Sequence, residues 1–301
     1  MAQTGRKKRL FGRFREKLAS VFIKDEKIRP NVMLKYYLDL SGTDYLHWGY
    51  WEEGAALTLE NFQAAQERYA GELLKLIPPG VESVLDVGCG VGGNARKLKE
   101  RGYILAGLAP DPYQEQLFKE RTGGEIPFFL TTFQDFQPDR LYDLVLMSES
   151  VQYIPLDRIF VKAKEVLPDG GYLLTSDYYR LENSRGVKEH HLPSVYLQDL
   201  LEEAESQGFE ILKQEDISQA VLPTLQYGRM LFSRYIKPTF SAQLLALKVH
   251  LPVGYKLLRA FLRLKLKGET IERIIRNNLD PLHPEVFTKY MKYLMILFQK
   301  K

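Results

Sequence analysis

The chain has 301 residues, 45% of them hydrophobic, and a formal net charge of +4 at neutral pH. This length and apolar content suffice for one large domain with an added segment. The only cysteine, Cys89, excludes internal disulfides, a zinc site built from cysteines and the two-cysteine chemistry of cytosine-5 RNA methylation. No apolar run has the length of a transmembrane helix, and no signal-peptide pattern opens the chain.

The charges are segregated along the sequence. Residues 1–30 contain ten basic and three acidic residues, whereas 217–268 contain nine basic residues and no acidic one. The remainder has 23 basic and 35 acidic residues, a formal charge of −12. We therefore expect an acidic body that carries two basic segments, both of them also rich in apolar residues.

Residues 1–30 form the first predicted element, a basic amphipathic segment. Apolar residues recur at helical spacing from Leu10 to Phe22 among Arg and Lys residues, which is typical of a helix lying in a membrane interface. Docking of this helix on the acidic body is the alternative. On the membrane interpretation the protein is cytoplasmic and peripheral, at the inner face of a membrane, and deleting residues 1–24 should weaken liposome binding.

Apolar runs alternate regularly with helical patterns from Val81 to Gln214, which predicts a doubly wound α/β fold. The expected sheet is seven-stranded, mostly parallel and Rossmann-like, with an N-terminal helical segment and a helical insertion between the last two strands. Strands are predicted at 82–87, 103–108, 127–131, 142–147, 171–176, 209–214 and 293–299. The predicted divisions are 1–30, 31–216, 217–290 as a substrate cap, and 291–301 as the returning strand. Prolines are expected to divide the insertion into several short helices.

The turn after the first predicted strand is the most informative motif. It reads Asp86-Val87-Gly88-Cys89-Gly90-Val91-Gly92-Gly93-Asn94. A glycine turn between strand and helix lets a ligand lie against bare backbone, facing the N–H groups of the helix start. The spacing matches neither the Gly-x-Gly-x-x-Gly of dinucleotide sites nor a phosphate loop. The turn therefore favours a small, uncharged or cationic nucleoside, with Cys89 as a small side chain packed beside it.

This turn resembles the first motif of class I S-adenosylmethionine (SAM) methyltransferases. The next predicted strand ends in Ala109, where most of that class holds the ribose hydroxyls with a carboxylate. The run Gly107–Gln114, the glycine turn and the aromatic segment His47–Trp51 resemble the sterol, tocopherol and cyclopropane-synthase-like branch. The resemblance spans about residues 36–214 and implies a methyltransferase fold with SAM as cofactor.

The resemblance also implies roles for individual residues. The Gln114 amide would hold the ribose, with Asp111 as the substitute, and the segment around Phe133 lies where the family holds adenine. The aromatic segment would bring Tyr45 and Trp48 to the cofactor. The implied cofactor-binding residues are Tyr45, Trp48, Asp86, Gly88, Cys89, Gly90, Asn94, Ala109, Asp111, Gln114, Thr132, Phe133, Gln134 and Ser148.

Methyl transfer from a sulfonium is an in-line displacement, which needs alignment and a dry pocket more than acid–base catalysis. A hydroxyl or carbon acceptor must still lose a proton, and the candidate catalytic groups are His191, Glu149, Tyr178 and Asp177. The adjacent His190 and His191 have no carboxylate or cysteine at ligand spacing, so no metal site is predicted. Val151 stands where cyclopropane synthases place a carboxylate, which favours plain methylation over ring closure.

The sequence thus predicts a methyltransferase for a small-molecule acceptor that is apolar or amphipathic, such as an isoprenoid, quinone or lipid, reached at an anionic membrane surface. The alternative acceptor is a soluble polar metabolite, an amine or natural-product hydroxyl. No nucleic-acid partner is expected, because the acidic body would repel phosphates. Part of the insertion is expected to cover the carboxyl ends of the strands. Oligomeric state and the atom methylated stay open.

Overall fold

The computed structural model describes residues 31–187, 192–265 and 283–301. The chain divides into two units, residues 1–40 and 41–301. In the first unit, the described part contains the start of helix α2 (Val32–Ser41). The basic helix predicted within residues 1–30 lies outside the described residues, so it stays a prediction.

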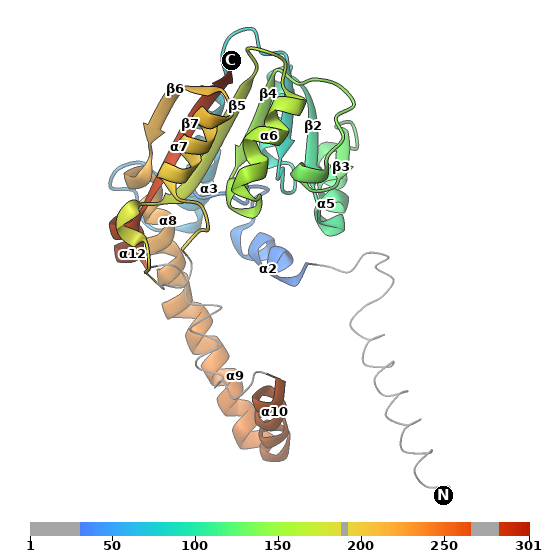
Figure 1. Cartoon of the computed structure of the whole chain (residues 1–301). Coiled ribbons are helices and arrows are strands. Elements are labelled where there is room, and N and C mark those ends of the chain that lie inside the picture. The colour runs from blue at the N-terminus through green and yellow to red at the C-terminus, as the bar shows by residue number, and fades with distance from the viewer. Residues whose placement is uncertain (1–30, 188–191, 266–282) are drawn as a thin grey trace, which may run out of the picture. The chain divides into compact units, whose positions relative to one another are not determined.

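The second unit is built on a seven-stranded sheet with the order β3-β2-β1-β4-β5-β7-β6 (Figure 1). β1 to β5 are parallel, and β7 lies antiparallel between β5 and β6. This order confirms the predicted doubly wound, mostly parallel fold. The strands are β1 (Ser83–Val87), β2 (Ile104–Ala109), β3 (Phe128–Leu130), β4 (Leu144–Ser148), β5 (Tyr172–Arg180), β6 (Phe209–Asp216) and β7 (Met291–Lys300).

β5 extends four residues beyond the predicted end of that strand. The prediction ended it before Asp177 because the polar and aromatic residues that follow do not continue the apolar run. β7 pairs with β5 as far as Arg180, opposite Met291, so the ladder of hydrogen bonds maintains the extended backbone there. Pairing with a distant strand therefore overrides the local pattern.

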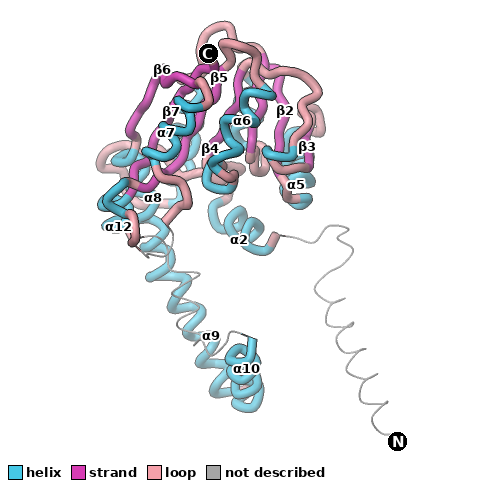
Figure 2. Tube along the Cα trace, in the orientation of Figure 1, coloured by secondary structure: helices cyan, strands magenta, loops and turns pink. Residues whose placement is uncertain are grey.

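Helices cover both faces of the sheet, as Figure 2 shows with α6 and α7 crossing its near face. Side chains alternate along each strand between two apolar clusters. On β7, Tyr293, Met295 and Leu297 join the cluster that contains α3, whereas Leu294 and Ile296 join the one that contains α6. The covering helices are α3 (Leu59–Leu74), α4 (Gly93–Glu100), α5 (Pro112–Thr122), α6 (Leu156–Val166) and α7 (Leu197–Ser206).

Local signals fix where the helices beside the sheet's carboxyl edge begin. The Thr58 side chain accepts from the Asn61 amide to cap α3. The Asp111 carboxylate accepts from the Tyr113 amide at 2.8 Å to cap α5, and Pro112 follows as its first residue. α5 ends at Gly123 in the left-handed region. The chain therefore enters α5 directly beside the glycine turn.

The described residues between β6 and β7 form the helices α8 (Ser218–Leu231), α9 (Lys237–His250), α10 (Pro252–Lys265) and α12 (Pro284–Tyr290). α8 packs on the body, since Val221 and Leu225 are buried in its core. The expectation that prolines divide this segment into short helices is wrong at Pro223, which lies inside α8. A π-helical turn at Phe232–Ile236 then leads directly into α9, in which no residue is buried.

Candidate functional site

A cavity of about 410 Å³ opens where the carboxyl ends of β1, β2 and β4 meet, the edge at which doubly wound folds bind ligands. Residues 44–47, the glycine turn, the start of α5, residues 132–134 and the turn after β4 line it. The sequence-predicted residues in this lining are Tyr45, Gly88, Cys89, Gly90, Asn94, Ala109, Asp111, Gln114, Thr132, Phe133, Gln134, Ser148 and Glu149.

The glycine turn brings bare backbone to the cavity wall. Gly88 has a φ of 74°, and its amide donates to the Leu108 carbonyl at 2.8 Å, which holds β1 and β2 together at their ends. A Cβ at Gly88 would lie 2.4 Å from the Ser150 Cβ. The Ser150 hydroxyl donates to the Val87 carbonyl at 2.6 Å, so Ser150 has no room to move away. Glycine at position 88 is thus required by both conformation and space.

Asp111 and Gln114, the two candidates that follow β2, differ in whether their side chains already have a hydrogen-bond partner among the described residues. The Asp111 carboxylate caps α5 and so is engaged with the backbone. Gln114 lies in the first turn of the same helix and lines the cavity. Nearby, the Thr132 hydroxyl donates to Asp135 at 2.6 Å, which orders the 3-10 turn Phe133–Asp135. The buried Phe133 ring lines the cavity beside it.

Glu149 follows β4 and has a φ of 53°, the one non-glycine residue in the left-handed region within the described part of the chain. Its Oε1 accepts from the Trp48 amide at 2.6 Å and from the Tyr293 hydroxyl at 2.7 Å. Burial raises the pKa of Glu149 to about 8 in spite of these two bonds. A half-buried, strained carboxyl at a cavity wall is typical of a functional residue.

Hydroxyl groups continue inward from Glu149. The Tyr293 hydroxyl lies 2.9 Å from that of Tyr69, which donates to Ser176 Oγ at 2.6 Å. Burial raises the pKa of both tyrosines, and the negative charge at Glu149 adds to the effect. Both phenols therefore stay protonated near neutral pH and act as hydrogen-bond donors.

Trp48, Tyr178 and Asp86 lie behind the cavity wall and are not among its lining residues. The Trp48 ring stacks on Tyr178, with centroids 5.1 Å apart and planes 16° apart, and the Tyr178 hydroxyl donates to Gln152. Asp86 is buried at the end of β1, and its Oδ2 has no hydrogen-bond partner among the described residues. Asn94 Oδ1 is a second buried oxygen without a hydrogen-bond partner among the described residues, and Asn94 does line the cavity.

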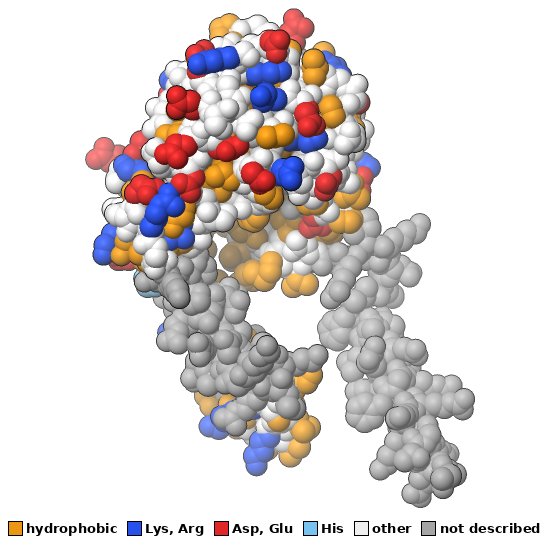
Figure 3. All heavy atoms as spheres, in the orientation of Figure 1, with side chains coloured by type: hydrophobic (Ala, Val, Ile, Leu, Met, Phe, Trp, Pro, Cys, Tyr) orange, Lys and Arg blue, Asp and Glu red, His pale blue; other side chains and the backbone are white. Residues whose placement is uncertain are grey.

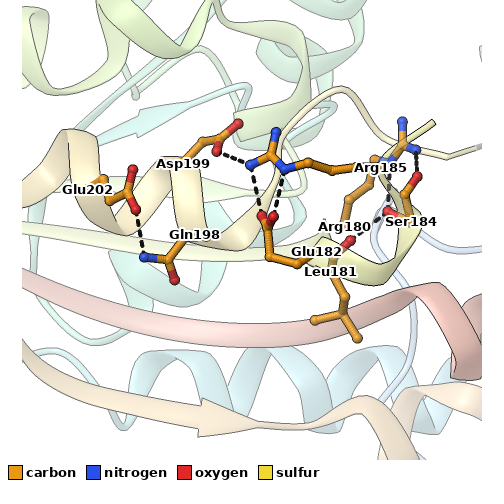
Figure 4. A network of polar contacts seen from close by, with 8 residues as sticks. All are labelled: Arg180, Leu181, Glu182, Ser184, Arg185, Gln198, Asp199 and Glu202. Atoms are coloured by element: carbon orange, nitrogen blue, oxygen red, sulfur yellow. Dashed lines mark hydrogen bonds and ion pairs between the residues drawn. The ribbon is translucent and has the colours of Figure 1, made fainter. Parts of the chain in front are cut away.

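His191, the first catalytic candidate, lies outside the described residues. The chain before and after that segment is held by a polar network, in which Arg185 bonds Glu182 and Asp199, and Arg180 bonds Ser184 (Figure 4). This network joins the end of β5 to the start of α7.

Sequence reasoning missed His47 and Asp44, which both line the cavity. Burial lowers the pKa of His47 to about 4. Its Nδ1 lies 2.7 Å from the Trp48 carbonyl oxygen, so the ring is neutral and carries its proton on Nδ1. Asp44 forms ion pairs with Arg96 and Arg121, each at 3.0 Å. The signal was present in the aromatic segment, but only the fold brings residues 44–47 to the glycine turn.

Three buried carboxyls gather near this edge of the sheet: burial raises the pKa of Asp86 and Asp177 to about 7 and that of Glu149 to about 8. Each binds a proton more tightly in the folded state, so its stabilising contribution is complete below the unfolded pKa of about 4 and is lost as pH rises through 7–8. His47 acts oppositely, but only below about pH 6.5.

We therefore expect the free energy of unfolding to fall between about pH 6.5 and pH 9. Denaturant unfolding at constant ionic strength measures it, and Asp177→Asn should flatten the profile because it removes one of the three titrating groups. A parent profile that is flat or rises with pH over this range would contradict the raised pKa values.

The chain is similar to known methyltransferases in both sequence and fold. Residues 62–214, about half of the chain, match the model of a family described as a methyltransferase domain. The chain is 28% identical over 156 residues to 2-methyl-6-phytyl-1,4-hydroquinone methyltransferase of Synechocystis sp., covering 48% of this chain and 47% of that protein. It is 28% identical over 218 residues to sterol 24-C-methyltransferase of Yarrowia lipolytica, covering 62% and 55%.

The chain thus spans about half the length of these two curated relatives. Among solved structures, geranyl diphosphate methyltransferase in complex with geranyl diphosphate and sinefungin is similar with a TM-score of 0.63. The match covers 90% of this chain and 94% of that one at 14% identity. At this identity the likeness concerns the fold alone.

Proposed function

This chain belongs to the methyltransferase-domain family, and on that premise we propose that it transfers the methyl group of SAM to an apolar or amphipathic small molecule. The acceptor would be of the isoprenoid, quinone or lipid class. When bound, SAM supplies an electrophilic methyl group on a positively charged sulfur. The chain's own residues would hold and orient it, exclude water and remove the acceptor proton.

The observation that carries this proposal is the charge of the cavity wall. Asp44, Asp111 and Glu149 line it, and no Lys or Arg is among the described residues of the lining. The net charge of the wall is small, because Asp44 is paired with Arg96 and Arg121 and Glu149, with a pKa of about 8, is largely protonated at neutral pH. A wall with carboxyl groups and without a cation suits a ligand with a sulfonium and an ammonium group and is unsuited to a pyrophosphate. Gly88, Gly90 and Gly93 bring bare backbone to the wall, and the orphaned Asn94 oxygen in the lining remains to be satisfied. The residues present therefore fit SAM.

We assign binding roles according to which side chains are already held by a hydrogen bond within the described part of the protein. Because Asp111 caps α5, we assign the ribose hydroxyls to the Gln114 amide. Thr132, Phe133 and Gln134 would hold the adenine, and the glycine turn the amino-acid part. Tyr45 lines the cavity, whereas Trp48 acts through its amide, which holds Glu149 in place.

Gln114→Ala should weaken SAM binding by about 1–2 kcal/mol, the scale of a lost hydrogen bond whose partner stays unsatisfied. Isothermal calorimetry measures the change. Gln116→Ala is the matched control, since Gln116 lies on the same helix but bonds Glu120 on the exposed surface. Equal SAM affinity for the parent and Gln114→Ala would remove Gln114 from the site.

Glu149 is our first choice for the group that removes the acceptor proton. It lines the cavity, and its pKa of about 8 lies close to the neutral range in which a general base works best. Tyr178 is a poorer candidate, because its hydroxyl is bonded to Gln152 behind the wall. His191 remains a candidate that the described residues do not address.

The acceptor class follows from the apolar part of the wall and from the relatives. Leu46, Val87, Leu108 and Ile154 line the cavity, and the two curated relatives are named for a phytyl hydroquinone and a sterol. Acceptors of this class reside in membranes, so we propose that the chain meets its acceptor at a membrane surface. No helix among the described residues is long and apolar enough to span a bilayer.

The test is labelling with methyl-labelled SAM and a cell extract separated into organic and aqueous fractions. We expect labelled product in the organic fraction, and SAM-dependent label should decrease for Gln114→Ala at low SAM concentration. Label confined to the aqueous fraction would instead support the soluble polar metabolite, and no label in either fraction would contradict methyl transfer.

A further inference from the structure

Helices α9 and α10, here called the α9–α10 pair, present two different faces. Phe240, Leu244 and Leu247 on α9 are half-buried, as are Tyr255 and Leu258 on α10. These residues recur at three- and four-residue spacing, which is one face of each helix. The helices contact one another, and the two views agree that α10 lies beside the end of α9 (Figures 1 and 2).

On each helix the side opposite these half-buried residues is apolar and exposed. Val253, Leu257 and Phe261 follow one another at four-residue spacing on α10, with 70, 66 and 56% of each exposed. Leu245 and Val249 do the same on α9, with 60 and 62% exposed. Single exposed apolar residues are ordinary, but a stripe at helical spacing marks an interaction surface.

The stripe is bordered by positive charge. Lys248, Lys256 and Arg259 are exposed, and Lys248 and Lys256 lie three positions after the stripe residues Leu245 and Val253, which makes them neighbours on the helix surface. No acidic residue occurs between 217 and 268. Figure 3 shows apolar and basic side chains next to one another at this end of the molecule. The body contrasts with this, because basic and acidic side chains alternate on the face that the figure shows.

The charge pattern selects among partners for this surface. A symmetric contact between two copies places the same patch against itself, which here would bring basic side chains together without any carboxylate to pair them. An anionic partner removes that repulsion. Leucine, valine and phenylalanine on one face with Lys and Arg beside them is the composition of helices that lie in the interface of an anionic bilayer.

We propose that the α9–α10 pair is the docking surface of this protein for anionic lipid membranes. The apolar stripe enters the boundary between headgroups and acyl chains, and Lys248, Lys256 and Arg259 contact the phosphates. This inference deepens the proposed function, on which it rests for its purpose, because it names the segment that brings the body to a membrane-held acceptor.

The experiment is flotation of the full chain with vesicles of phosphatidylcholine, alone or mixed with phosphatidylglycerol. We expect binding to the anionic vesicles. Lys256→Glu with Arg259→Glu should lower the partition coefficient about tenfold or more, since each basic side chain near such a surface contributes about 1 kcal/mol. Leu257→Asn with Phe261→Asn should lower it too, without any change of charge.

The matched control is Arg158→Glu with Lys164→Glu, two exposed residues of α6 on the body. It changes the net charge equally and should leave flotation within about twofold of the parent, because one or two remote charges are largely screened. Loss of flotation by this control, or flotation of both α9–α10 variants like the parent, would overturn the proposal. A variant that changes the oligomeric state in sedimentation would instead assign the surface to a second copy, and overturn it equally.

SAM calorimetry on the same proteins separates this inference from the proposed function. The α9–α10 variants should bind SAM like the parent, because none of the altered residues lines the cavity. A parent that binds SAM but not anionic vesicles would overturn the docking surface and leave the function standing. A parent that binds vesicles but not SAM would do the reverse.

Discussion

Gly88→Ala should weaken SAM binding by on the order of 100-fold, or about 3 kcal/mol. Alanine at a φ of 74° costs about 1–3 kcal/mol by itself. Its Cβ would also lie 2.4 Å from the Ser150 Cβ, so the turns after β1 and β4 must separate. Both turns line the cavity, and the displacement therefore distorts the place where we expect the amino-acid part of SAM. Calorimetry gives the affinity, and denaturant unfolding shows how much stability is lost.

Gly102→Ala separates conformational strain from the clash. Gly102 has a φ of 87°, but a Cβ there would meet nothing within 4 Å, and the residue does not line the cavity. This control should lose stability while binding SAM like the parent. Should Gly88→Ala fail to fold, the double variant Gly88→Ala with Ser150→Gly relieves the contact and should recover part of the stability. Parent-like SAM affinity in folded Gly88→Ala would show that the glycine turn has been misassigned.

Glu149→Gln should lower the rate of methyl transfer by about 10²–10⁴, the usual contribution of a general base. Glutamine retains an oxygen that can accept from the Trp48 amide and the Tyr293 hydroxyl, so the turn should persist and SAM affinity should change much less than the rate. The parent rate should rise with pH through about 8, as the Glu149 carboxyl loses its proton. This limb of the pH profile should be absent in Glu149→Gln.

Asp177→Asn is the matched control for this carboxyl. Asp177 is fully buried, whereas Glu149 is half-buried. The pKa of Asp177 is also raised by burial, to about 7, and the residue lies on the neighbouring strand, but it does not line the cavity. The Asp177 Oδ1 accepts from the Tyr178 amide, a bond that asparagine can keep. A large rate loss in Asp177→Asn with none in Glu149→Gln would transfer the proton-accepting role to Asp177.

The sheet was readable from the sequence because its strands are short apolar runs bounded by turn residues, and each predicted start lies within two residues of the observed one. The glycine turn was readable for the same local reason. The orientation of Trp48 was not, because it depends on contacts with Phe287 and Tyr293, more than 200 residues away in the chain. The sequence led us to expect the Trp48 ring against the ligand, whereas in the fold this ring packs against the hydrophobic core.

For Glu149, part of its role could be predicted from neighbouring residues in the sequence, and part depends on distant segments. Its type and its position after a strand made it a candidate. Its left-handed backbone, however, follows from bonds to Trp48, Ser176 and Tyr293 on three other segments. The cap predicted for the insertion is a similar case. α8 packs on the body as expected, but α9 buries none of its residues, and none of the described residues of 217–290 lines the cavity.

The position of β7 has a consequence for how the chain comes off the ribosome. β7 lies between β5 and β6 although it follows both in the chain. β6 therefore has no strand to pair with while residues 217–290 are translated. During that interval β5 has one open edge and β6 two, and open edges invite pairing with other chains. The glycine turn is synthesised early, whereas the Tyr293 phenol follows Glu149, to which it bonds, by 144 residues. A nascent chain can therefore assemble the nucleoside end of its cavity well before the acid–base end is complete.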